Sequence, residues 1–138
     1  MNPTITTQEP VIAPYWDDHN RGTGSISYLV TGTAPNRVLE VNWNNINVSG
    51  GGGTGANTAS FLLRLYEANN QIEFIYDGVM TPIGTPTASI GIVDLTTYKS
   101  VTPGAPSTVS SAATNNGISS LANVVGTVSY THLAGDSQ

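Results

Sequence analysis

The residues with the greatest chemical potential lie in one run, Tyr15-Trp16-Asp17-Asp18-His19-Asn20. Carboxylate and amide oxygens are the hard ligands that calcium prefers, so this run is a candidate calcium site. Because the run is short, at least one more carboxylate would have to reach it from elsewhere in the fold. The candidate ligands are Asp17, Asp18, Asn20 and, from farther along the chain, Asp77 or Asp94.

A structural interpretation of the same run is favoured over the metal site. The chain contains no calcium loop in which aspartates alternate with other residues before a glycine. Trp16 is expected to plug the core, while Asp17 and Asp18 cap backbone amides in the turn that follows. Calcium therefore stays a weak possibility, and we predict neither a metal nor a cofactor.

Catalysis has less support than metal binding. His19 and His132 are the only histidines, and neither is set beside a nucleophile such as the serine of a G-x-S-x-G elbow. A glycosidase-type pair of carboxylates could be formed among Glu40, Glu67 and Glu73. An ion pair of Glu40 and Glu73 with Arg64, across neighbouring strands, is a simpler account. We predict that the chain is not an enzyme.

Exposed aromatic side chains could form a platform for glycans, because sugars stack their apolar faces on tyrosine and tryptophan. Both tryptophans lie in apolar patterns and are expected in the core. Tyrosines on a sheet are also common as simple strand-formers, so the two interpretations stay close. The candidate glycan-binding residues are Tyr15, Tyr66 and Tyr98.

Composition excludes several classes of function. The chain has 138 residues, one domain's worth, and only 9% of them are charged, with four basic and nine acidic residues. So little positive charge leaves no footprint for nucleic acid. No cysteine is present, so disulfides and thiolate metal sites are excluded. No stretch approaches the ~20 apolar residues of a membrane-spanning helix, so no membrane insertion is expected.

Alternation with a period of two dominates the chain and predicts strands. Ser25–Thr31 alternates Ile26, Tyr28 and Val30 with Ser and Leu, and Arg37–Val48 places Leu39, Val41 and Trp43 on one face. At Asn44–Asn45 the phase shifts, so that Ile46 and Val48 become the apolar set. A β-bulge would explain this shift.

The segments Phe61–Glu67 and Gln71–Asp77 predict a hairpin. Asn69-Asn70 between them tolerates positive φ and suits a two-residue turn. The apolar residues are expected to be buried, Arg64 and Glu73 exposed, and Glu67 in need of a hydrogen-bonding partner at the end of the core face. The predicted pairs are Leu65–Phe74 and Leu63–Tyr76 on the core face, with Arg64–Ile75 and Tyr66–Glu73 on the other.

Shorter strands complete the pattern. They are expected at Ala88–Val93, Lys99–Val101, Thr108–Ser111 and Val124–Leu133, separated by loops rich in Ser, Thr, Pro and Gly. Several short strands with almost no helix predict a single all-β domain over residues 1–138, an antiparallel β-sandwich with jelly-roll-like character.

Four blocks at regular intervals carry a resemblance to a known kind of domain. They contain Ile12-Ala-Pro-Tyr-Trp-Asp-Asp18, Pro35-Asn-Arg-Val-Leu-Glu-Val-Asn-Trp43, Phe61–Tyr76 and Ala88-Ser-Ile-Gly-Ile92. Together they resemble a β-sandwich domain of secreted and cell-surface proteins in Bacteroidetes-type bacteria, and they are similar to nidogen-like domains. The resemblance implies an extracellular or cell-surface address, with export of the parent protein by the type IX route.

The function expected from this resemblance is that of a non-catalytic extracellular module for adhesion or spacing, with possible glycan contact. Two alternatives stay open: a self-assembling subunit of a fibre or shell, and a carbohydrate-binding module of a secreted hydrolase. In the resembled family an N-terminal half precedes the Ile-Ala-Pro block, whereas only ten residues precede Val11 here. We therefore expect an open sheet edge, an under-covered apolar face and self-association through that edge.

Overall fold

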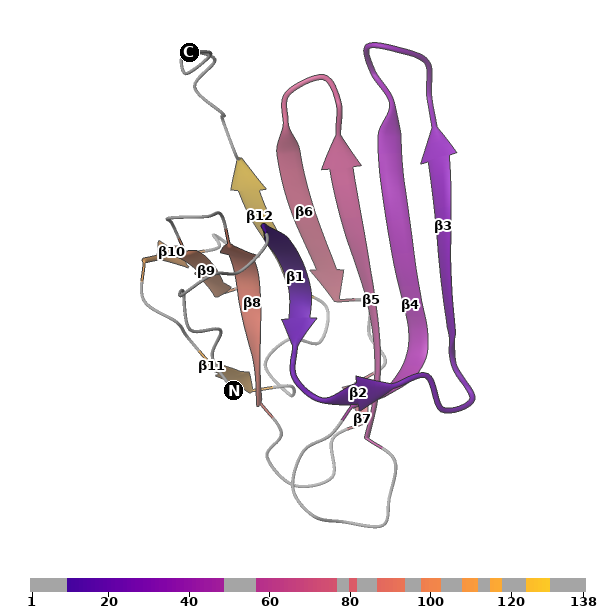
Figure 1. Ribbon diagram of the computed structural model, residues 1–138, viewed down its shortest axis with the longest axis vertical. Coiled ribbons are helices and arrows are strands. Elements are labelled where there is room, and N and C mark those ends of the chain that lie inside the picture. Colours follow the sequence, from indigo (N-terminus) through magenta and orange to yellow (C-terminus); the bar gives the residue numbers. More distant parts are fainter. Residues whose placement is uncertain are drawn as a thin grey trace.

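The fold is all-β, as the alternating pattern predicts. The computed structural model describes residues 10–48, 57–76, 80–81, 87–93, 98–102, 108–111, 115–117 and 124–129. Within these ranges the chain forms strands and no helix, arranged in two antiparallel sheets (Figure 1). The antiparallel β-sandwich prediction is confirmed.

The large sheet has seven strands, most of them contiguous in sequence. Its central path runs β12-β6-β5-β4-β2, with β3 also paired to β4 and β7 to β5. Consecutive hairpins therefore build most of this sheet. Its strands are β2 (His19–Asn20), β3 (Ser25–Thr31), β4 (Val38–Val48), β5 (Asn57–Tyr66), β6 (Gln71–Tyr76), β7 (Met80–Thr81) and β12 (Val124–Ser129).

The small sheet has five strands and takes its edge strand from the start of the described chain. Its path runs β1-β8-β9-β10, and β11 pairs with β8. The strands expected in the second half of the sequence are found here and in β12. The bounds are β1 (Val11–Trp16), β8 (Thr87–Val93), β9 (Tyr98–Thr102), β10 (Thr108–Ser110) and β11 (Asn115–Gly117).

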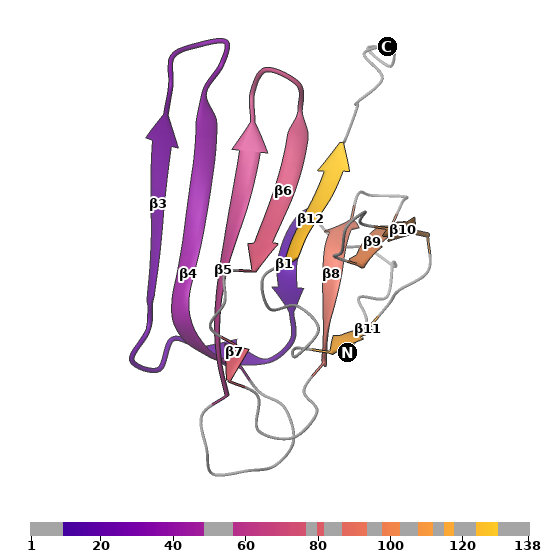
Figure 2. The ribbon, with the colours of Figure 1, turned by 180° about the vertical axis from the view of Figure 1, so that it is seen from behind.

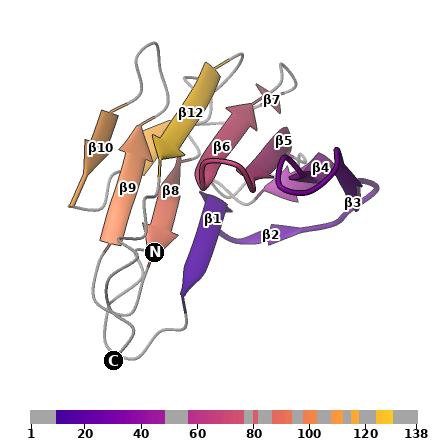
Figure 3. The same cartoon turned by 90° about the horizontal axis from the view of Figure 1, so that it is seen from above.

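The two sheets overlap only in part. In the views from the front and from behind, β3 and β4 stand to one side of β1 (Figures 1 and 2). The view from above shows the small sheet facing β12, β6 and β5, while β4 and β3 extend past β1, the last described strand of the small sheet on that side (Figure 3). Among the described strands, the small sheet therefore covers one half of the large sheet and leaves the other half as a single layer.

The core fills the overlap between the sheets. Aromatic side chains from both layers meet there: the Tyr15 ring of β1 stacks on Phe61 of β5, with ring centroids 5.5 Å apart. The Tyr76 hydroxyl donates a hydrogen bond to the Pro14 carbonyl, which joins β6 to β1. The other members are aliphatic and come from both sheets. Buried core residues include Val48, Ala59, Leu63, Ile72, Phe74, Ala88, Ile90, Ile92 and Val101.

The predicted bulge in β4 is confirmed. Pairing between β4 and β5 shifts between Trp43 and Ile46, and Asn45 takes a φ of 53°. The extra residue keeps the apolar set on the inner face, since Ile46 is fully buried. Gly24 lies against the bulge, where a Cβ atom would collide with the carbonyl oxygen of Asn45.

The β5–β6 hairpin differs from the predicted one by two residues. Leu63 lies opposite Phe74 and Arg64 lies opposite Glu73, and residues 67–70 form the turn in place of Asn69-Asn70 alone. The predicted pairing is therefore wrong. Because side chains alternate with a period of two, a slip of two residues leaves each one on its predicted face. Phe74 is fully buried as expected.

The hairpin faces can be tested by a pair of substitutions in β6. Phe74→Ala should lower the free energy of unfolding by about 3–5 kcal/mol, because it empties a fully buried site between the sheets. Glu73→Ala, at the adjacent position on the other face, should cost less than about 1 kcal/mol. Urea denaturation of both variants measures the difference. Equal costs would mean that the two faces are assigned incorrectly.

Candidate functional site

Tyr15 belongs to the core and is only 3% exposed. Its ring lies between Phe61, on which it stacks, and the edge of the His19 ring, with centroids 6.5 Å apart. Burial raises the pKa of its hydroxyl well above the ordinary value, and the nearby Asp17 adds to the shift. In this position Tyr15 offers no open face on which a sugar could stack.

The rest of the Tyr15–Asn20 run forms a turn held by its own polar groups. Asp17 Oδ1 accepts a hydrogen bond from the Asp18 amide at 2.8 Å, as the capping interpretation predicts. Asn20 Oδ1 accepts one from Asn47 Nδ2 at 3.4 Å, beside the pairing of β2 with β4. Trp16, expected to plug the core, is only half-buried, and Tyr15 beside it takes the core position instead.

Among the described residues, no three or more of the His, Asp and Glu side chains gather as a metal site would require. Asp77 and Asp94, the possible additional ligands, lie outside the described residues, as does His132. The side-chain oxygens of Asp17 and Asn20 accept hydrogen bonds from a backbone amide and from an amide side chain.

The outer face of the large sheet carries a polar cluster around Arg64. Glu40 Oε2 lies 2.8 Å from Arg64 Nε, and Glu73 Oε2 lies 3.5 Å from Arg64 Nη1. Register places the three residues side by side on β4, β5 and β6. The expected cross-strand ion pair is therefore present. Arg64 and Glu73, expected to be exposed, are half-buried because they pack against each other.

Tyr66 joins this polar cluster through its hydroxyl, which donates a 2.8 Å hydrogen bond to Glu73 Oε2. That bond raises the pKa of the hydroxyl, because ionisation would place two negative charges together. Tyr98, the third candidate glycan residue, begins β9, and its side chain is outside the described part of the structure. Of the two candidates whose side chains are described, Tyr15 lies in the core and Tyr66 on the outer face, so these two do not share a surface.

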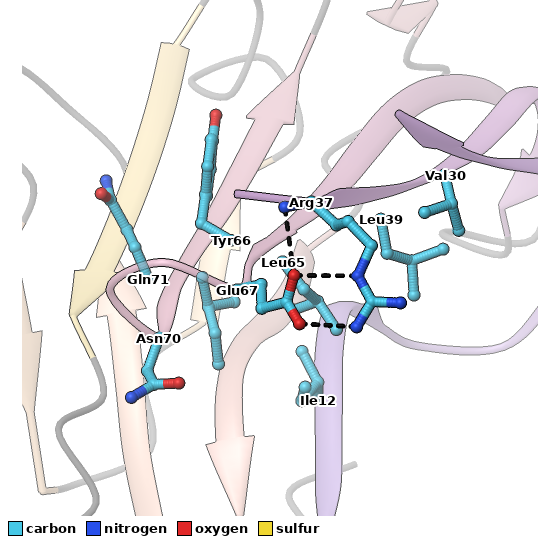
Figure 4. A pocket seen from close by; sticks show the side chains of 10 residues that line it. Ile12, Val30, Arg37, Leu39, Leu65, Tyr66, Glu67, Asn70 and Gln71 are labelled. Atoms are coloured by element: carbon cyan, nitrogen blue, oxygen red, sulfur yellow. Dashed lines mark hydrogen bonds and ion pairs between the residues drawn. The ribbon is translucent and has the colours of Figure 1, made fainter. Parts of the chain in front are cut away.

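A second ion pair closes the end of the sheet near the hairpin turns. Arg37 Nη2 and Nε reach the two carboxylate oxygens of Glu67 at 2.6 and 2.9 Å (Figure 4). The Arg37 amide also donates to Glu67 Oε2 at 3.2 Å. These bonds lower the pKa of Glu67 to about 2. Glu67 therefore has the partner that its position requires.

Alternation alone did not reveal how exposed the apolar half-sheet is. We define the apolar half-sheet as the inner-face residues of β3 and β4. On β3 these are Ile26, Tyr28 and Val30, which are 54%, 78% and 53% exposed. Each lies opposite an apolar residue of β4: Trp43, Val41 and Leu39 respectively. The period-two pattern predicted an apolar face here, and the face exists, but no strand of the small sheet that the structure describes covers it.

A groove of about 490 Å³ lies at the boundary between the apolar half-sheet and the small sheet. Ile12 of β1 forms one wall, Val30, Leu39 and Leu65 line the apolar part, and the Arg37–Glu67 pair closes one end (Figure 4). Ile12 is itself 38% exposed. The groove can accept an apolar segment, and its charged end is already neutralised within the chain.

The comparison with known families agrees with this architecture. Residues 1–132 match the family described as NIDO related. The chain belongs to the NIDO-related family. The nidogen-like resemblance seen in the sequence is therefore confirmed at the level of the family, which indicates an extracellular-type module. No curated protein and no solved structure gives a significant match.

Among the residues that the structure describes, no helix is long and apolar enough to cross a membrane.

Calcium should leave the stability of this member of the NIDO-related family unchanged. A calcium site of micromolar Kd would add about 4 kcal/mol at millimolar calcium, because ligand stabilisation grows as RT ln(1 + [L]/Kd). We expect thermal melting midpoints to coincide in millimolar calcium and in chelator. A midpoint several degrees higher in calcium would establish a metal site at or near Asp17–Asn20.

The Arg37–Glu67 pair should make stability depend on pH at the acidic end. The Glu67 pKa is about 2 in the folded chain against an ordinary 4.5, so its contribution is complete above pH ~4.5 and is lost as the pH falls towards 2. Glu67→Gln should therefore lower the melting midpoint at pH 6 and have little effect at pH 2. Because the pair is exposed, added salt should shrink the difference. A variant whose deficit is the same at both pH values would contradict this role.

Proposed function

We propose that this chain is a non-catalytic extracellular module that makes protein–protein contacts, of the kind used in adhesion, through its apolar half-sheet. The observation that carries the proposal is the row Ile26, Tyr28 and Val30, each more than half exposed on one face of one strand. Single apolar residues are common on protein surfaces, whereas contiguous apolar patches mark interaction sites.

The edge of the same strand supports a protein partner. Among the described residues β3 pairs only with β4, so its outer backbone donors and acceptors face away from the sheet. Such an edge is a template for another strand, and strand addition is a frequent mode of recognition. The apolar row and the open edge together suit an extended or sheet-forming protein segment.

The polar groups of the described chain support a non-catalytic role. The carboxylates of Glu40 and Glu73 share Arg64, and the carboxylate of Glu67 is held by Arg37. A general acid or base needs a proton-transfer group that is free to meet a substrate. These three carboxylates are engaged in ion pairs that join neighbouring strands.

Family membership and the sequence blocks support an extracellular location. The NIDO-related family indicates an extracellular context, and a surface low in charge but rich in Thr, Ser and Asn suits one. From the resemblance of the Ile12–Asp18 block we infer that the parent is a secreted or cell-surface protein of a Bacteroidetes-type bacterium, in which this module serves adhesion or spacing.

A glycan-binding role is less favoured by the geometry. Tyr28 presents an open ring, but its neighbours on the apolar half-sheet are Ile26, Val30 and Val41, which offer no hydrogen bonds to sugar hydroxyls. Carbohydrate sites combine apolar surfaces with placed polar groups. Binding on a glycan array that is lost in Tyr28→Ala would reverse this preference, and would favour a carbohydrate-binding module.

The contact surface can be tested with the fluorescent apolar probe anilinonaphthalene sulfonate. The probe should bind the wild-type chain, and Tyr28→Ser should reduce its fluorescence at least about two-fold by removing the largest exposed apolar group of the row. Serine adds no charge that would attract this anionic dye. Because Tyr28 is 78% exposed, the melting midpoint should change little.

The matched control is Leu29→Ser, at the neighbouring position on the opposite face of β3, where the leucine is 59% exposed. It removes a similar exposed side chain without touching the apolar half-sheet. Its dye fluorescence should stay close to that of the wild type. If Tyr28→Ser has no larger effect than Leu29→Ser, the apolar half-sheet is not the binding surface and the proposed function fails.

A further inference from the structure

In the part of the chain that the structure describes, the small sheet covers one half of the large sheet but not the apolar half-sheet. β1 is the last strand of the small sheet on that side, and β4 and β3 extend beyond it (Figure 3). A sandwich layer packs about 10 Å above the sheet that it covers. A partner that covers the apolar half-sheet would therefore lie beside β1, about 10 Å above β3 and β4.

We infer that the partner is a second copy of this chain, which packs its own apolar half-sheet against this one. The inference rests on the proposed function, because it names the occupant of the same surface. It follows from the self-complementary chemistry and shape of the half-sheet.

The chemistry of the half-sheet allows it to meet itself. In a two-fold dimer the same patch lies on both sides, so any unbalanced charge in the patch would face its own kind. β3 is Ser-Ile-Ser-Tyr-Leu-Val-Thr and carries no charged residue. The charges nearest the groove, Arg37 and Glu67, neutralise each other at 2.6 Å. Nothing on the described half-sheet repels an identical surface.

The shape is also self-complementary. In cross-section the described strands form a long layer and a short layer, and the short layer leaves the β3 end of the long layer uncovered (Figure 3). A two-fold axis parallel to the strands places the uncovered end of each long layer over that of the other. Each copy then occupies the layer that is missing beside the β1 strand of its partner. The two uncovered surfaces are buried in one event.

The same axis also brings two open edges together. A rotation about an axis parallel to the strands preserves strand direction, and β3 and β1 run in opposite directions (Figure 1). β3 of one copy would therefore lie antiparallel to β1 of the other. Each of these strands is paired on one side only among the described residues. Pro14 in β1 limits how many backbone bonds can form there.

The dimer should be weak. β3 has seven residues, so the half-sheet is about 24 Å long and about two strands wide, which is small beside the roughly 800 Å² per partner of standard stable interfaces. Interfaces below that size are usually transient. We expect a Kd of about 100 µM, in the range where local concentration on a cell surface or along a tandem array would decide occupancy.

Sedimentation over a dilution series from about 1 µM to about 1 mM tests the inference, because this range spans the expected Kd. The wild type should pass from monomer to dimer. Tyr28→Lys should raise the Kd at least about 100-fold, since the two-fold places the new ammonium in both copies of an apolar interface. Leu29→Lys, on the opposite face beside Glu40, should leave the Kd within about three-fold of the wild-type value.

Cysteine substitution separates face packing from edge pairing of two β3 strands. Edge pairing centred on Tyr28 would hold the two residues at about 5 Å between Cα atoms, close enough for a disulfide. Face packing keeps the layers about 10 Å apart, which is too far. Tyr28→Cys should therefore oxidise to a dimer no faster than Leu29→Cys. Faster disulfide formation at position 28 would overturn the proposed arrangement.

Two results would overturn the second-copy inference directly: a wild-type chain that stays monomeric at about 1 mM, and equal weakening by Tyr28→Lys and Leu29→Lys. Neither would remove the proposed function if Tyr28→Ser still lowers dye binding more than Leu29→Ser does. In that case the half-sheet binds a different protein. Loss of the dye difference would instead overturn both.

Discussion

The contact between β1 and the large sheet determines the rest of this structure. The Tyr15 ring stacks on Phe61, Phe61 stacks on Trp43 with centroids 5.1 Å apart, and the Tyr76 hydroxyl donates to the Pro14 carbonyl. This aromatic row fastens the edge strand of the small sheet across the middle of the large one. Because β1 is the boundary of the small sheet, its position decides which inner-face residues are buried and which are left at the surface.

Much of the fold could be predicted from alternation. Strands, faces and the bulge at Asn44–Asn45 follow from where apolar residues recur, because a half-buried strand requires a period of two. The hairpin pairing was missed because its determinant is not local. Glu67 is held by Arg37, thirty positions earlier in sequence, and its amide donates to the Arg37 carbonyl at 3.0 Å. That contact leaves Glu67 in the turn, whereas the sequence near Asn69-Asn70 favoured a tighter one.

The apolar half-sheet could be predicted only in part from the sequence. Alternation in Ser25–Thr31 indicates an apolar face, but it does not indicate whether another layer covers that face. Tyr15 and Tyr28 illustrate the difference: the sequence suggested Tyr15 for an open platform and placed Tyr28 only in an alternating apolar row. The structure exposes Tyr28 by 78% and Tyr15 by 3%, because the small sheet reaches β5 and stops short of β3. Exposure here depends on how far a second sheet extends, which is a property of the whole topology.

The β3 edge has no charged residue to protect it from pairing with another strand. Natural edge strands are usually protected by lysine, proline, bulges or short length. β1, another edge strand among the described residues, contains Pro14, whereas β3 is seven residues long and uncharged. Arg37 and Arg64 are engaged in ion pairs, and Arg21 donates to the Gly24 carbonyl at 3.3 Å. The net charge of −5 gives copies a general repulsion, which physiological salt screens beyond about 8 Å. At contact distance nothing in the described part of β3 opposes a neighbouring strand or layer, so its surface chemistry favours association over isolation.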